Sequence, residues 1–141
     1  MKNKAAIFFY HLLALTLTTI FLLPLIALLI SHDAVVGEME RGTMILLLSY
    51  PVGRYQVILV KFGGHVLILA CATVIGYGAA AAALAVTGAS VLAASWYAFA
   101  SMLGTSILLG AVFVAIGYLI SSLVRDRGTA AGVSVGIWLL M

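Results

Sequence analysis

The chain has 141 residues, of which 65% are hydrophobic and only 8% are charged. A soluble domain carries about a quarter charged residues, so this chain cannot cover itself with a polar surface and its solvent is lipid. The net charge of +3 comes from seven basic and four acidic residues, too few basic residues for the basic and aromatic face of a nucleic-acid-binding protein. One cysteine, Cys71, excludes an internal disulfide.

Four apolar runs predict an all-α fold, a polytopic transmembrane helix bundle that forms a single domain over residues 1–141. The spans are expected at about 5–30, 62–86, 98–123 and 130–141. The first three are long enough to cross a hydrocarbon core of about 30 Å at a rise of about 1.5 Å per residue. The fourth is too short to cross. We therefore expect three full spans and a truncated fourth, in a fragment of a longer protein.

Residues 33–61 form a polar loop between the first two spans and hold six of the charged residues. Within this loop, Gly42 permits a sharp turn and Thr43 can cap a following helix. That helix, Met44 to Leu48, is short and apolar, and Pro51 ends it because the residue before a proline is forced out of the helical region. Such a short helix is marginal in water, so its apolar row must be buried against the membrane surface, the base of the bundle or a groove in a partner.

The basic residues in the loops predict the orientation of the chain. Because spans alternate in direction, the polar loop and the segment 124–129 fall on the same side of the membrane. That side carries Arg41, Arg54, Lys61, Arg125 and Arg127, whereas the other side carries Lys2 and Lys4. Five basic residues against two favour a cytoplasmic polar loop.

Small residues are frequent in the spans and predict close approach of helix backbones. They fit either a tightly packed static bundle or helices that slide against each other, and composition does not separate these alternatives. The residues concerned are Gly63, Gly64, Gly76, Gly78, the run 79–83, Gly104, Gly110, Gly117, Gly132 and Gly136.

Residue patterns typical of enzymes occur in the sequence, but their surroundings do not fit the structures that these patterns need. Gly132 to Gly136 fits the G-x-S-x-G pattern around Ser134, but the hydrolase motif needs a strand, a sharp turn and a helix, and here the run is uninterrupted and apolar. The sequence contains no P-loop. The three histidines are scattered without ligand spacing, and no charged residue lies inside the first three spans, which argues against an ion-coupled carrier. We therefore expect no catalytic residue, metal site or cofactor in this chain.

The polar loop resembles the first cytoplasmic loop of ABC-2 type transporter permeases. In that family an acidic-Arg-Gly-Thr segment, a leucine-rich turn, a proline and an arginine precede the next span. Within the family the chain is most similar to the permeases of nitrous oxide reductase maturation systems. The segments that carry this resemblance are Leu23 to Leu29, Asp33 to Glu38, Leu46 to Pro51, Lys61 to His65 and Ile75 to Gly78. One departure is Val60, where the family usually has glycine before the lysine.

The resemblance implies a six-span, multi-pass permease of the bacterial or archaeal cytoplasmic (inner) membrane. It also implies a homodimer, a separate ABC ATPase subunit that hydrolyses the ATP, and a periplasmic maturation subunit. The polar loop would then be a coupling loop that docks the ATPase, and the alternative is a structural membrane subunit without its own transport path. The implied ATPase-coupling residues are Glu38, Glu40, Arg41, Gly42, Thr43, Met44, Ile45, Leu46, Leu47, Leu48, Pro51 and Arg54.

Overall fold

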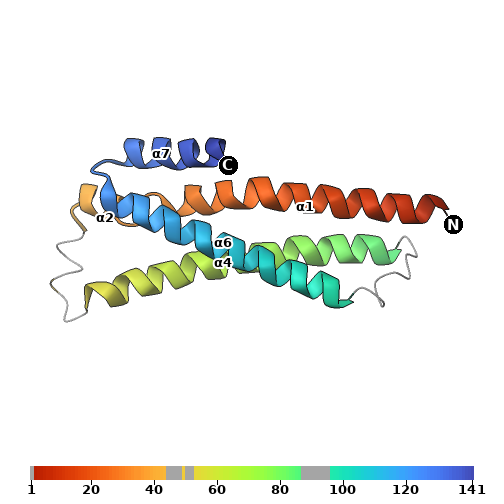
Figure 1. The fold of residues 1–141 in the computed structure, drawn as a ribbon. Helices are drawn as coiled ribbons and strands as arrows, with labels where there is room; N and C mark the ends of the chain where they lie inside the picture. Colours follow the sequence, from red (N-terminus) through yellow and green to blue (C-terminus); the bar gives the residue numbers. More distant parts are fainter. Residues whose placement is uncertain (1, 44–48, 50–52, 87–95) are drawn as a thin grey trace.

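The computed structural model describes residues 2–43, 49, 53–86 and 96–141, and the regular secondary structure among them is all helix, joined by turns and bends. Three long helices lie along one another, and a shorter one lies beside the first of them (Figure 1). The helices are α1 (Lys2–Ser31), α2 (Val36–Glu40), α4 (Arg54–Val86), α6 (Trp96–Leu123) and α7 (Arg127–Leu140). The predicted all-α membrane bundle is therefore confirmed.

Among the described residues, three helical stretches are long and apolar enough to cross a membrane: Leu13–Glu40, Tyr55–Ala83 and Tyr97–Leu123. Large apolar side chains on all three stretches point outward, as lipid-facing residues do; Phe21, Ile75 and Leu108 are examples. The helix α1 continues past the buried Pro24, as helices in membranes commonly do.

The helix α6 packs against both α1 and α4 and so forms the centre of the bundle (Figure 1). One buried cluster joins all three helices through Leu23, Leu69 and Val114. A second cluster joins the end of α1 to α2, α6 and α7 through Leu28, Val36, Ile120 and Ala130.

Two glycines on α6 explain its close approach to α1. A Cβ at Gly110 would lie 2.9 Å from a methyl carbon of Leu23, and one at Gly117 would overlap the Oγ of Ser31. The prediction of close backbone approach is thus confirmed at these two positions. At the other glycines of the predicted set no described atom lies within 4 Å of an added Cβ, and for them close approach stays a prediction: Gly63, Gly64, Gly76, Gly78, Gly104, Gly132 and Gly136.

Candidate functional site

The four acidic residues of the chain, Asp33, Glu38, Glu40 and Asp126, lie at one end of the bundle. The helix α2, the start of α4 and the junction between α6 and α7 all lie at that end (Figure 1). We call the set Asp33, Glu38, Glu40, Lys61 and Arg127 the polar clamp, because these side chains bond the segment after α1 to two later helices.

The segment between α1 and α2 is held on α6 by Ser121. The Oγ of this buried serine accepts hydrogen bonds from the backbone N–H groups of Val35 and Val36, both at 3.0 Å. The first N–H groups of a helix have no partner within that helix, so Ser121 supplies what the start of α2 lacks. The buried side chain of Val36 packs beside it in the second cluster. Together these contacts fix where α2 lies on α6.

Lys61 connects α4 to α2. Its Nζ lies 2.6 Å from Oε1 of Glu38 and also donates to the carbonyl oxygen of Ala34 at 3.3 Å. The Lys61 and Glu38 side chains are 33% and 21% exposed, so the pair is partly shielded from solvent. Partial shielding makes a charge-assisted hydrogen bond stronger than a fully exposed ion pair.

Arg127, the first residue of α7, contacts the same segment from the opposite side. Its Nη2 lies 3.5 Å from Oδ2 of Asp33 and donates to the carbonyl of Gly37 at 3.4 Å. Its Nε is buried 3.4 Å from Oε2 of Glu40, within ion-pair range but without hydrogen-bond geometry. A Cβ at Gly37 would lie only 2.5 Å from Nη2, so a larger residue there would displace the guanidinium.

Asp126 fixes the start of α7 and therefore the position of Arg127. Its two carboxylate oxygens accept from the backbone N–H and the hydroxyl of Thr129, each at 2.7 Å. The Thr129 hydroxyl, followed by the backbone N–H, holds the pKa of Asp126 below its usual value. This arrangement is an N-cap, and the negative charge also favours the positive end of the α7 dipole. The Arg127 N–H then donates to Oε1 of Glu40 at 3.0 Å.

The structure places the first implied coupling residues within this site. The carboxylates of Glu38 and Glu40 bond to Lys61 and Arg127 within the chain. The Arg41 side chain is exposed.

The turn after α2 begins at Gly42, whose φ of 69° lies in the left-handed region that favours glycine. The Thr43 hydroxyl bonds to the carboxylate of Glu38. Arg54 is the first residue of α4. The other implied coupling residues lie outside the described residues: Met44, Ile45, Leu46, Leu47, Leu48 and Pro51.

Sequence reasoning missed the roles of Ser121, Lys61 and Arg127 in this site. Lys61 and Arg127 could have been found from the sequence. An apolar chain has few charged residues, and each of them is expected to pair with an opposite charge. Ser121 could not have been found in this way, because a serine in a span is usually bonded within its own helix. Its partners lie 86 and 85 positions away in the sequence.

The scan against family models matches residues 2–141 to the ABC-2 family transporter protein model. Two curated relatives are each named "Probable ABC transporter permease protein NosY". The relative from Pseudomonas aeruginosa is 51% identical over 126 residues, which cover 89% of this chain and 46% of the relative. The relative from Stutzerimonas stutzeri is 50% identical over 121 residues, which cover 85% of this chain and 44% of the relative. The chain thus spans about half the length of these relatives. With three apolar helices of spanning length and this match, the chain is a multi-pass membrane protein that belongs to the ABC-2 family of transporter proteins.

Proposed function

We propose that the chain is part of the membrane-spanning permease of an ABC-2 transporter, in which a separate ATPase subunit docks on residues 33–61. The observation that carries this proposal is the polar clamp. One short segment, residues 33–40, is bonded to α4 through Lys61, to α6 through Ser121 and to α7 through Arg127. A protein that displaces this segment would therefore pull on three helices.

The docking element in this proposal is the apolar row Met44 to Leu48, which follows the Gly42 turn directly. The contacts of the clamp support separate roles for the acidic residues and the apolar row. The carboxylates of Glu38 and Glu40 are bonded within the chain, so these residues would transmit force and would not contact the ATPase. The exposed Arg41 and the apolar row are then the surfaces left for the partner.

The orientation and setting of the protein follow from the same proposal. With five basic residues at the clamp end, that end faces the cytoplasm, where an ATPase has its ATP. We further propose a homodimer in the inner membrane of a bacterium or archaeon, acting with a periplasmic subunit in maturation of the copper sites of nitrous oxide reductase. The support for these finer statements is the sequence resemblance, since the names of the relatives state an ABC transporter permease and nothing finer.

A pull-down tests the docking proposal. The protein, expressed from its complete gene with a tag, is solubilised in mild detergent, and co-purifying proteins are identified by mass spectrometry. We expect a P-loop ATPase with the wild type and with Leu47→Met, which keeps the apolar volume. We expect its loss with Leu47→Asp, because a carboxylate in an apolar groove is costly to desolvate.

Two outcomes would contradict the proposal. Retention of the ATPase by Leu47→Asp would exclude the apolar row as the docking element. Absence of any ATPase from the wild-type sample, with the protein folded and membrane-inserted, would favour the structural subunit without a transport path.

A further inference from the structure

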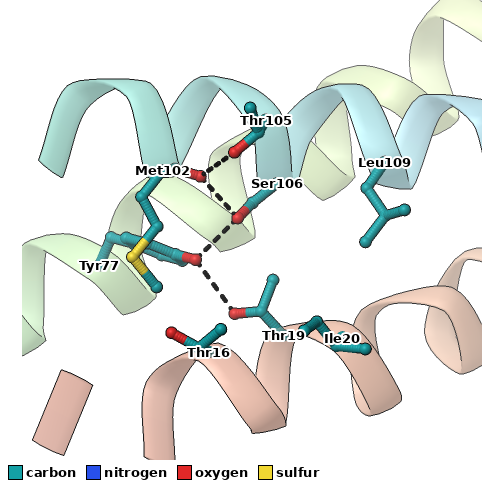
Figure 2. Close-up of a pocket in the computed structure, with 8 residues that line it drawn as sticks. All are labelled: Thr16, Thr19, Ile20, Tyr77, Met102, Thr105, Ser106 and Leu109. Carbon is teal, nitrogen blue, oxygen red and sulfur yellow. Dashed lines mark hydrogen bonds between the residues drawn. The ribbon is translucent and has the colours of Figure 1, made fainter. Parts of the chain in front are cut away.

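A pocket of about 280 Å³ lies between α1, α4 and α6, and none of its lining residues belongs to the polar clamp. It is close to the lower limit of about 300 Å³ for small-molecule sites in proteins. Thr16 and Thr19 lie near the middle of α1, so the pocket lies within the membrane-spanning part of the bundle. Its lining residues, drawn in Figure 2, are Thr16, Thr19, Ile20, Tyr77, Met102, Thr105, Ser106 and Leu109.

Three hydroxyl groups in the pocket form a chain across the three helices (Figure 2). The Tyr77 hydroxyl lies 3.1 Å from Oγ1 of Thr19 on α1 and 2.7 Å from Oγ of Ser106 on α6. Thr19 and Ser106 can each donate to a carbonyl of their own helix, at 2.8 and 2.7 Å. Tyr77 and Ser106 are only 4% and 5% exposed. Their oxygens therefore form the floor of the pocket.

The pocket has spare hydrogen-bond acceptors but few spare donors. A hydroxyl group has one hydrogen and two lone pairs. The single Tyr77 hydrogen can serve only one neighbour, so the chain is complete when Thr19 donates to Tyr77, Tyr77 donates to Ser106, and Ser106 donates to the carbonyl of Met102. Thr105 donates within its own helix, to the carbonyls of Ser101 and Met102. Most lone pairs on these oxygens remain open. A ligand can therefore donate to the site without breaking a bond, whereas an acceptor would have to compete for a hydrogen already in use.

The remaining lining favours an apolar and uncharged molecule. The surface of the pocket is mostly hydrocarbon, from Ile20, Leu109 and the Met102 side chain. No lining residue among those described is charged, and no group of three metal-ligating side chains occurs in the described part of the chain. An ion would have to lose its hydration shell without a counter-charge, at a cost of several kcal/mol or more.

We propose that this pocket binds a small uncharged hydroxyl compound, an alcohol whose O–H donates to the oxygens of Tyr77 and Thr19 and whose carbon chain lies against Ile20 and Leu109. The site is independent of the proposed ATPase docking, because none of its lining residues belongs to the polar clamp. Failure of one proposal therefore leaves the other intact.

Photolabelling with an alcohol tests this proposal directly. The full-length protein in lipid nanodiscs is irradiated with a diazirine derivative of octanol, and the adducts are mapped by mass spectrometry. We expect adducts on lining residues of the pocket, Tyr77 and Met102 among them. Octanol should compete for this labelling about tenfold better than 1-methoxyheptane, since the ether has the same atoms but no hydrogen to donate. Equal competition by the two compounds, or labelling confined to lipid-facing residues outside the pocket, would overturn the proposal.

Two variants separate hydrogen bonding from shape. Tyr77→Phe keeps the ring and removes the central oxygen, and Thr19→Val removes the second oxygen with little change in volume. In each, the advantage of octanol over the ether should shrink to about threefold or less. Ser122→Ala, which removes an exposed hydroxyl bonded only within its own helix among the described contacts, should keep the full tenfold advantage. An advantage that survives both pocket variants would refute the assignment of these acceptors. If one of the two pocket variants fails to fold, the other still tests whether the hydroxyl oxygens accept from the alcohol.

Discussion

The contribution of the polar clamp to stability can be measured at the ion pair between Glu38 and Lys61. The two charged atoms lie 2.6 Å apart, and the side chains are 21% and 33% exposed. A hydrogen bond to a charged group contributes about 1.5–3 kcal/mol, and a fully exposed ion pair about 0.2–1 kcal/mol. Because this pair is partly shielded, we expect a coupling energy of about 1–1.5 kcal/mol between the two side chains.

A double-mutant cycle measures this coupling. The variants are Glu38→Gln, which can still accept from Thr43, Lys61→Met, and the two together. The free energy of unfolding is measured by titrating the protein in mixed micelles with sodium dodecyl sulfate. The double variant should lose less stability than the sum of the single losses, by the coupling energy given above. A second cycle of Glu38→Gln with Arg125→Gln, an exposed residue, should be additive within about 0.5 kcal/mol.

The cycle can refute the clamp. If Glu38→Gln and Lys61→Met are also additive within about 0.5 kcal/mol, the two side chains do not interact in the folded protein, and α4 is not bonded to α2. The argument that displacement of residues 33–40 pulls on α4 would then fail, whatever the pull-down shows.

Three further predictions concern the surroundings of the clamp and the helix contacts. Gly117→Ala should lower the free energy of unfolding by about 1–3 kcal/mol because its methyl group overlaps α1, whereas Gly78→Ala, with open space around it, should not. Ser121→Ala leaves two backbone N–H groups without their acceptor and should cost about 1–3 kcal/mol; Ser122→Ala is the exposed control. Asp126 has a folded-state pKa below its usual 3.8, so its stabilising effect is complete above that value and is lost as the pH falls through the lower folded pKa. The melting temperature of the wild type should therefore exceed that of Asp126→Ala by a constant margin from neutral pH to roughly pH 5, and the margin should shrink below about pH 4; a margin that grows on acidification would contradict the cap.

The sequence predicts the spans and the turn at Gly42 because each depends on properties of nearby residues. The length of an apolar run decides whether it can cross a membrane, and glycine alone adopts a φ of 69° without strain. The partners of Glu40 and Val36 could not be predicted in this way. Arg127 lies 87 positions from Glu40 and Ser121 lies 85 positions from Val36, so each contact depends on how α6 and α7 pack.

The same limit applies to the glycines of the spans. A glycine in a span indicates close packing only if its face of the helix meets another helix. Gly110 and Gly117 lie on the face of α6 that meets α1, seven residues apart. Gly63 and Gly76, on α4, have no described side chain near them. All four positions are glycine, so the residue type alone does not distinguish those that contact another helix from those that do not.

The polar contacts of α4 bear on the choice between a static bundle and sliding helices. Near the clamp end Lys61 bonds to α2, further along His65 lies 2.9 Å from the Tyr118 hydroxyl on α6, and in the pocket Tyr77 bonds to Ser106. A shift of α4 by one helical turn along its axis is about 5.4 Å, enough to take each bond beyond hydrogen-bond range. Such a movement would have to break the three bonds together. If the three bonds break together, α4 moves between discrete positions. A gradual slide of α4 would instead lose the three hydrogen bonds one after another, with no new bond to replace each.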